Sequence, residues 1–340
     1  MEDNEFFLPH EIISSILKRL PVKSLLRFRC VCKDWNDLFK TSLFIKEHLH
    51  HSSHHRGPSL LLQCGYSTFS MLDSDKKTLL PPSAPSVNQP VYIIGSSYGL
   101  VCLQHSFQLR VSGSLFLWNP STREVQCVPQ IKNNHFCRIA FGFSRVVNDY
   151  KIVKIFDYKP AEVYSLSTGS WKKVEFINRK LLKGVGFLGS FAATDQAIYW
   201  LSYHNQIDIL SFDLATEVFT FIPRPDVQYI HRHIRLIAYE NKLALLSGIE
   251  FWVMEEATSG GSGQRWSKTK VFGGPCLRSL HPLNIWRNEV VFDFEHQPKV
   301  GINLFNLTSN KLKEFLIAGN YGIRSAFHYV ETLASIGDRN

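Results

Sequence analysis

The first fifty residues carry apolar side chains at the spacing of α-helices. Between residues 12 and 20 they recur at positions i, i+3 and i+4, which places one apolar stripe on a helix that ends before Pro21. A second helix carries Leu25 and Phe28, and a third runs from residue 31 to residue 39. Because the connections are short, these three helices are predicted to be neighbours in space.

After residue 56 the pattern changes from the helical period to short apolar strands. Six such runs begin at residues 59, 99, 150, 197, 242 and 289, so consecutive runs start 40 to 51 residues apart. Each run is followed by a second strand that ends in a turn, and then by a third strand. The turns are expected at Asp73, Asn119, Ser165, Asp213, Met254 and Asn306. Asp, Asn and Ser suit the first turn position because their side chains bond the backbone two residues on.

Six similar units of about 45 residues predict a β-propeller with six blades. Each small antiparallel sheet would bury its faces against its neighbours, and closure into a ring would remove the exposed ends. The C-terminal segment 324–336 reads as one more strand and is expected to complete the ring. A β-sandwich is the alternative, but it accounts for the strands without accounting for their even spacing.

The change of pattern divides the chain into a small all-α module at 1–50, a linker at 51–58 and an all-β domain at 59–340. The linker region is rich in histidine, with His48, His50, His51, His54 and His55. Structural zinc sites need ligand pairs at fixed spacing, and no Cys-x-x-Cys pair accompanies these histidines. The sequence therefore predicts a solvated linker, with no metal and no cofactor.

The helical module carries more apolar side chains than three short helices can bury. A unit of about 40 residues is also near the lower limit for a domain that folds without a staple or a partner. Surplus apolar surface of this kind is typical of a protein interface. The alternative is a helical cap that rests on the following domain.

The string LPHEIISSILKRLPVKSLLRFRCVCKDWNDL at residues 8–38 resembles an F-box. One departure is His10, where that family more often has an acidic residue. The resemblance implies docking on the Skp-family adaptor of a cullin-based ubiquitin ligase. The side chains that it implies for adaptor binding are Leu8, Pro9, Ile13, Ile16, Leu20, Pro21, Leu25, Val31, Cys32 and Trp35.

Residues 95–336 resemble the kelch-like F-box-associated domain of plant F-box proteins. The segments that carry this resemblance are GSSYGLVCL, LFLWNPSTRE, FGFSRVVNDYKIVKIF, AEVYSLSTGSWKKVE and YVETLASI. The class includes the S-locus F-box proteins. The resemblance implies a kelch-like propeller that captures a protein target.

The net charge of +9 does not by itself indicate nucleic-acid binding. Residues 1–50 contain eight Lys or Arg against seven Asp or Glu, so most of the excess lies in the β domain. In the third helix Asp34 and Asp37 lie beside Lys33, and their charges would repel phosphate. The seven cysteines are scattered and lie mostly in apolar segments, so they are expected to be reduced and packed, Cys30 and Cys32 included.

Catalytic motifs are missing from the sequence. It contains no GxSxG, HExxH, Walker loop or dinucleotide fingerprint. The N-terminus is acidic, unlike a secretory signal, and no apolar run approaches the ~18 residues of a membrane span. These observations favour a non-catalytic protein of the cytoplasm or nucleus that crosses no membrane.

The function that these features favour is an adaptor with two surfaces. The helical module would bind the Skp-family adaptor and, through it, a cullin scaffold, while the propeller captures a protein target for ubiquitination and degradation. Two loops rich in basic and aromatic side chains suit an acidic or phosphorylated target. Their expected contact residues are Arg179, Lys183, Arg224, Tyr229, His231, Arg232 and Arg235. The alternative is a protein-interaction module unconnected with ubiquitin, whose helices cap the propeller or dimerise.

Overall fold

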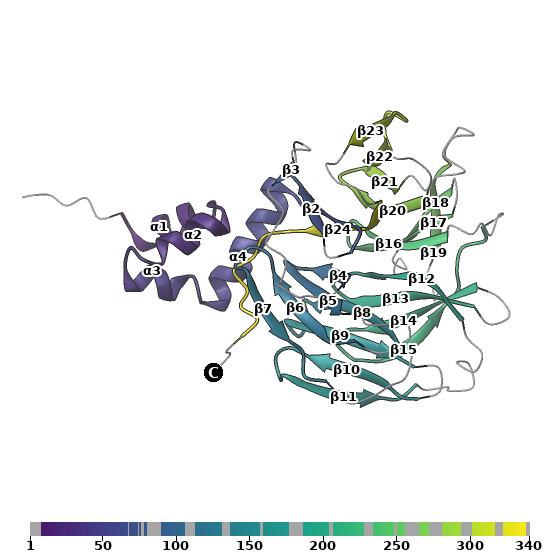
Figure 1. Ribbon diagram of the computed structural model, residues 1–340, viewed down its shortest axis with the longest axis horizontal. Helices are drawn as coiled ribbons and strands as arrows, with labels where there is room; N and C mark the ends of the chain where they lie inside the picture. Colours follow the sequence, from purple (N-terminus) through teal and green to yellow (C-terminus); the bar gives the residue numbers. More distant parts are fainter. Residues whose placement is uncertain are drawn as a thin grey trace, which may run out of the picture.

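The chain folds into a small group of helices beside a ring of β-sheets (Figure 1). The computed structural model describes residues 8–66, 68–73, 75, 78–79, 90–105, 113–130, 137–156, 159–176, 186–203, 207–227, 234–247, 250–255, 265–271, 281–293, 301–316 and 322–337. The helical elements are α1 (His10–Leu17), α2 (Val22–Phe28), α3 (Lys33–Leu38), α4 (Ser42–His51) and the π-helical turn η1 (Ser52–Arg56). Within this part of the chain, no helix has the length and apolar character needed to span a membrane.

Six four-stranded sheets form the β domain, and every strand pair within them is antiparallel. The strands of each blade are given from the inner to the outer one. Blade 1 consists of β24 (Ile323–Tyr329), β1 (Ser59–Cys64), β2 (Phe69–Leu72) and β3 (Thr78–Leu79), and blade 2 of β4 (Val91–Ser97), β5 (Leu100–His105), β6 (Leu115–Asn119) and β7 (Glu124–Cys127). Blade 3 consists of β8 (Arg138–Ser144), β9 (Asp149–Ile155), β10 (Ala161–Ser165) and β11 (Ser170–Val174), and blade 4 of β12 (Gly186–Ala193), β13 (Ala197–Tyr203), β14 (Ile207–Asp213) and β15 (Phe219–Ile222). Blade 5 consists of β16 (Ile234–Tyr239), β17 (Lys242–Ser247), β18 (Glu250–Glu255) and β19 (Arg265–Val271), and blade 6 of β20 (His281–Trp286), β21 (Glu289–Asp293), β22 (Gly301–Asn306) and β23 (Leu312–Leu316). The predicted six-bladed propeller is confirmed, and the β-sandwich alternative is excluded.

The ring is closed by the last strand of the chain. Strand β24 pairs with β1, with Leu61 opposite Phe327 and Leu62 opposite Ala326. The inner strands contact one another in the order β4, β8, β12, β16, β20 and β24, and β24 contacts β4 again. Blade 1 is therefore built from both ends of the β domain, as the sequence predicted for the C-terminal segment.

Polar side chains at the predicted turn positions fix the connections between the third and fourth strands of several blades. Asn119 Oδ1 accepts a hydrogen bond from Ser121 N at 2.9 Å, and Asp213 Oδ1 accepts one from Ala215 N at 2.9 Å. Asn306 Oδ1 accepts one from Thr308 N at 3.1 Å. In each case the side chain bonds the backbone N–H two residues later in the chain. This N–H lies in the turn, where the hydrogen bonds between neighbouring strands have ended.

The core lies between successive blades. Where blades 1 and 2 meet, Leu61 and Val101 are fully buried, and the rings of Phe69 and Trp118 lie 5.5 Å apart. An indole N–H also ties blades together, since Trp266 of β19 donates to the Pro223 carbonyl at 2.9 Å. Each blade thus covers an apolar face that its neighbour could not bury alone.

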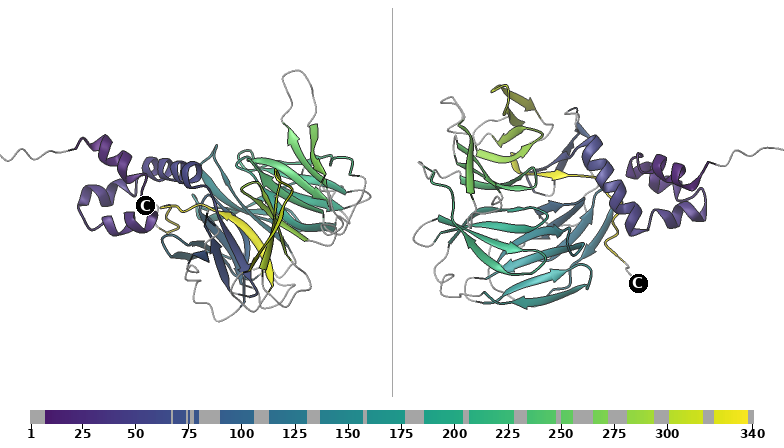
Figure 2. Two further views of the ribbon diagram at one scale, coloured as in Figure 1. Left: turned by 90° about the horizontal axis from the view of Figure 1, so that it is seen from above. Right: turned by 180° about the vertical axis from the view of Figure 1, so that it is seen from behind.

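The uniform strand order gives the propeller two different faces. Every inner strand begins at the same side, which we call the connection face; it is defined by the first residues of these strands, Val91, Arg138, Gly186, Ile234, His281 and Ile323. In blades 2 to 6 the outer strand ends at this side as well. Strand β1 begins at the opposite side, which we call the helix face, because α4 and η1 lead into it there. The left view of Figure 2 shows α4 at that side, together with the β18–β19 hairpin.

The segment 51–58 is not the solvated linker that the sequence predicted, because it continues helix α4 and then forms η1 as far as Arg56. Thr41 caps α4 by accepting a hydrogen bond from Phe44 N at 3.3 Å. The side chains of Phe44 and His48 are buried against the helical module, and His48 Nε2 donates to the Leu20 carbonyl at 2.9 Å. The histidine-rich composition suggested a linker, so the sequence pattern did not indicate the fourth helix, α4, which buries one face against the helical module.

We predict that acidification destabilises the protein through His48. Burial lowers the pKa of His48, and its Nδ1 has no hydrogen-bond partner among the residues that the structure describes, so protonation would bury an unpaired charge. The stabilisation is complete above the unfolded-state pKa of about 6.5 and is lost as the pH falls through the folded-state pKa, by up to about 1.4 kcal/mol per pH unit. Chemical denaturation of the full chain between pH 7.5 and 5.5 measures this loss.

The variant His48→Gln keeps a donor for the Leu20 carbonyl but does not titrate, so it should show a flatter pH dependence. His10→Gln, at an exposed position in α1, is the matched control and should follow the wild type. Equal pH dependence in His48→Gln and the wild type would contradict the prediction.

Candidate protein-interaction surfaces

Helix α1 turns one apolar stripe toward solvent. Ile12 and Ile16 of α1 are 48% and 49% exposed, and Leu8, which lies two residues before the helix, is 55% exposed and is counted with this stripe. Leu17 on another side of the helix is buried in the core of the module. Helix α1 is therefore apolar on two sides, and only one of them has a partner within the described chain.

A second exposed apolar position lies in the turn between α2 and α3. Val31 is 60% exposed there, and Cys30 and Cys32 beside it are exposed as well. The prediction that these two cysteines are packed was wrong, because the turn lifts them away from the core. Trp35 is half-buried, with its ring 5.7 Å from that of Phe28, so the indole supports this turn and also forms part of its surface.

The structure separates the residues implied for adaptor binding into three groups. Ile13, Leu20 and Trp35 are half-buried, and Leu25 is fully buried. The remaining six are exposed: Leu8, Pro9, Ile16, Pro21, Val31 and Cys32. Ile12 was not among the expected contacts, although its position four residues after Leu8 was a visible signal.

Leu25, one of the residues implied for adaptor binding, is buried in this conformation. Its side chain lies in the core of the helical module, packed with Leu17, Val22 and Phe39. Leu333 from the C-terminal segment completes the same cluster. The partner that buries this module comes from more than 300 residues away in the sequence, so the helical pattern alone could not separate Leu25 from the exposed leucines.

The C-terminal segment 330–337 joins the propeller to the helices. Glu331 Oε2 accepts a hydrogen bond from Val22 N, the first backbone amide of α2, at 3.1 Å. Glu331 also forms an ion pair with Arg56 of η1, whose guanidinium in turn donates to the Arg19 carbonyl. Burial raises the pKa of Glu331, while Arg56 and the Val22 amide oppose this shift. One carboxylate thus connects the propeller, α2 and η1.

The same segment is fixed to blade 2. Asn119 Nδ2 donates to the carbonyl oxygens of Thr332 and Ala334, at 3.1 Å and 2.8 Å. Gly99, in the β4–β5 turn, has a φ of +82°, and a Cβ there would overlap the Thr332 side chain and the Val330 carbonyl. The segment therefore lies between blade 2 and the helices, with Glu331 and Leu333 contacting the helices and Thr332 and Ala334 contacting blade 2. These contacts attach the helical module to the ring.

The residues expected to contact a target lie around the connection face where the structure describes them. Arg224 follows β15 and donates to the Pro225 carbonyl at 3.0 Å. Arg235 is half-buried on the inner strand β16 and donates to the Leu283 carbonyl of blade 6 at 3.3 Å. Burial lowers the pKa of Arg235. The others, Arg179, Lys183, Tyr229, His231 and Arg232, lie outside the described residues.

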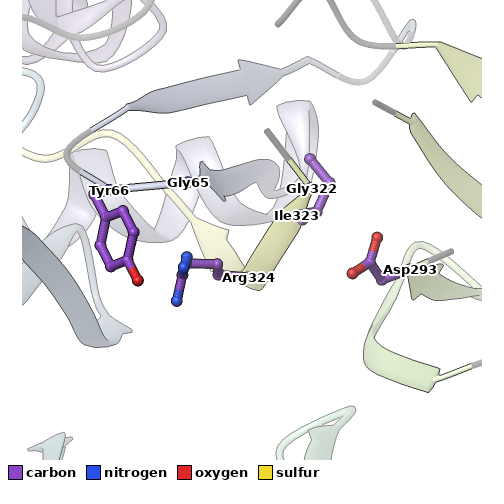
Figure 3. Close-up of a pocket in the computed structure, with 6 residues that line it drawn as sticks. All are labelled: Gly65, Tyr66, Asp293, Gly322, Ile323 and Arg324. Atoms are coloured by element: carbon purple, nitrogen blue, oxygen red, sulfur yellow. The ribbon is translucent and has the colours of Figure 1, made fainter. Parts of the chain in front are cut away.

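A small hollow opens at the connection face between blades 6 and 1 (Figure 3). It has a volume of about 240 Å³ and is lined by Gly65, Tyr66, Asp293, Gly322, Ile323 and Arg324. These residues come from the β1–β2 turn, the end of β21 and the start of β24. None of them was singled out from the sequence, because the ring closure that brings them together joins residues about 250 positions apart.

Comparison with known proteins identifies both parts of the chain. The model of the F-box associated beta propeller domain matches residues 61–330, and the model of the F-box domain matches residues 7–47. The chain belongs to the F-box associated β-propeller family. The family resemblance read from the sequence is confirmed, and the exposed stripe of α1 lies in the F-box domain of this family member.

Relatives from Arabidopsis thaliana match this F-box protein over most of its length. An F-box/LRR-repeat/kelch-repeat protein is 27% identical over 299 residues, covering 82% of this chain and 80% of the relative. An F-box protein is 30% identical over 307 residues, covering 78% and 72%. A chain in the crystal structure of a nidogen/laminin complex superposes with a TM-score of 0.51 at 12% identity, covering 81% of this chain and all of that one, which shows the fold alone.

We predict that Glu331→Ala loosens the joint between the F-box domain and the propeller. The substitution leaves the Val22 amide and Arg56 without their common acceptor. The loss should be about 2 kcal/mol, since hydrogen bonds to a charged group contribute about 1.5–3 kcal/mol each but this pair is partly exposed. Thermal denaturation measures the stability, and small-angle X-ray scattering measures the spread of domain positions.

Glu314→Ala, at an exposed glutamate on β23, is the control and should match the wild type in both measurements. A Glu331→Ala variant with unchanged melting temperature and unchanged scattering would show that the joint does not depend on this carboxylate.

Proposed function

We propose that this F-box protein is the substrate-recognition subunit of a Skp–cullin–F-box ubiquitin ligase. The observation that carries the proposal is the exposed apolar stripe Leu8, Ile12 and Ile16, with Val31 nearby in sequence, on a domain that matches the F-box model. Exposed apolar side chains that lie together are typical of a surface that a protein partner covers, whereas a single exposed apolar side chain is ordinary. A Skp-family adaptor is the partner that an F-box implies, and the cullin scaffold binds through that adaptor.

The propeller is proposed to capture a protein target on its connection face. This face is opposite to the side on which α4 enters the ring, so bound adaptor and bound target would not compete for one surface. The Glu331 joint supports a fixed distance between them. Ubiquitin transfer then depends on holding the target's lysines near a charged enzyme, which is an effect of proximity, and this chain supplies no catalytic group.

The basic side chains Arg224 and Arg235, on either side of residues 228–233, and the net charge of +9 favour an acidic or phosphorylated target. The proposed location is the cytoplasm or the nucleus. The alternative is an interaction module unconnected with ubiquitin, in which the apolar stripe of α1 mediates dimerisation.

We predict that Val31→Asp and Ile12→Asp each abolish co-purification with a Skp-family adaptor. A carboxylate placed in an apolar interface loses its hydration without gaining a partner, which costs several kcal/mol and weakens binding by roughly a hundredfold or more. Co-expression followed by affinity purification measures the retained adaptor. Val146→Asp is the matched control, because this valine is 75% exposed in the β8–β9 turn of the propeller. Wild-type protein that retains no adaptor, and instead forms dimers that Ile12→Asp dissociates, would favour the alternative.

We also predict that the chain itself becomes ubiquitinated in a reconstituted reaction with adaptor, cullin scaffold, ubiquitin and the charged enzymes. Its own surface lysines are held close to the transfer site, so no target needs to be known. Val31→Asp should reduce the modification to the level seen without adaptor, whereas Val146→Asp should not. Equal modification of wild type and Val31→Asp would contradict tethering through the F-box.

A further inference from the structure

The hollow between blades 6 and 1 exposes backbone as well as side chains. Gly65 N donates to the Gly322 carbonyl at 3.1 Å, which holds the β1–β2 turn against the start of β24. An added Cβ at Gly322 would meet nothing within 4 Å, so this position is open to solvent. The volume of about 240 Å³ is below the roughly 300–1,000 Å³ of sites for small molecules. It fits one side chain of a longer ligand.

Arg324 is held in this hollow by aromatic rings. Its guanidinium carbon lies 3.9 Å from the centre of the Tyr66 ring and 6.0 Å from that of Tyr92. The two tyrosine rings meet edge to face with centres 5.6 Å apart, and Tyr66 is 50% exposed. Figure 3 shows the guanidinium turned toward Tyr66. Stacking fixes the plane of the fork but uses none of its N–H groups.

The donors of Arg324 have no partner in the described part of the chain. Arg324 is exposed, and no hydrogen bond or ion pair engages it among those residues. An arginine that is oriented by rings and not by a carboxylate presents a preformed fork to an anion, because little side-chain freedom remains to be lost on binding. This arrangement distinguishes Arg324 from Arg224 and Arg235, which already donate to carbonyl oxygens.

Asp293 lines the opposite side of the hollow. Figure 3 shows its carboxylate on the far side of Gly322 and Ile323 from Tyr66, while the Arg324 fork points the other way. An anion that meets the Arg324 fork therefore lies on the side away from this carboxylate.

We propose that this hollow binds an acidic side chain of the captured target, a carboxylate or a phosphate, with Arg324 as the bidentate donor and Tyr66 as the platform that orients it. The site rests on the proposed function in that the bound peptide belongs to the target. It lies on the connection face, and it places the anchoring contact at blades 6 and 1 instead of the β15–β16 connection between blades 4 and 5.

The test measures binding of the full-length protein to three nonapeptide libraries with randomised flanks and a fixed central phosphoserine, Glu or Ser. The wild type should bind the acidic libraries roughly tenfold more tightly than the Ser library, as expected for a charge-assisted bidentate contact. Preference for the phosphoserine library alone would identify phosphate as the ligand group, and equal preference for both would show that a carboxylate suffices.

Arg324→Ala should remove the acidic preference, and Tyr66→Leu should weaken it while leaving the charge in place. Arg265→Ala, at an exposed arginine at the start of β19 on the helix face, removes the same charge elsewhere and should keep the preference. Melting temperatures verify that each variant is folded. Equal binding of all three libraries by the wild type, or a preference that survives Arg324→Ala, would overturn the proposal.

Adaptor binding by the same variants separates this site from the proposed function. Arg324→Ala should co-purify with a Skp-family adaptor as well as the wild type does, because the hollow lies on the face opposite to the F-box entry. Loss of acidic preference with adaptor binding intact supports the site. Failure of the wild type to bind any such adaptor would reject the ligase function, while the library result would still decide the peptide site.

Discussion

The pairing of β24 with β1 is the constraint on which the rest of the structure depends. It brings the end of the β domain against its beginning and so turns six sheets into a closed ring. Without that pairing, blade 1 would lose its inner strand, and the apolar faces of blades 1 and 6 would lie open to water. Contacts between residues so distant in sequence are slow to form because the loop that they close is long. The ring therefore depends on the contact that forms with the greatest loss of chain entropy.

The closing strand also determines where the F-box domain lies. Beyond Tyr329 the chain lies between Gly99 of blade 2 and the helices, and Glu331 and Leu333 contact the helices. Leu333 completes the apolar core of a module that is too small to bury its own surface. Closure of the ring and attachment of the helices are thus consequences of one continuous segment. The proposed function, in which the chain holds two partners at a fixed separation, would require such a connection more than a particular chemistry.

The two faces of the propeller differ because all blades share one strand order. In blades 2 to 6 the chain begins at the inner strand and ends at the outer strand, so both the first and the last residues of each of these sheets lie on the connection face. The α4 helix enters on the helix face, where the inner strands end. Arg324 and Tyr66 meet on the connection face only because the first turn and the last strand of the ring are neighbours there.

The sequence by itself determined the number of blades, although it predicted three strands in each unit where the structure has four, and three helices where it has a fourth, α4. The period of 40 to 51 residues predicted six blades, and side chains such as Asn119 and Asp213 marked their turns, because these signals depend on local backbone geometry. It also determined the F-box, whose residues lie within one short string. The tertiary structure alone decided that Leu25 is buried, that Cys30 and Cys32 are exposed, that Glu331 contacts α2, and that Arg324 lies beside Tyr66 of the first blade. Burial and contact across the closed ring depend on pairing between distant segments, and a pattern along the chain carries no record of which segments meet.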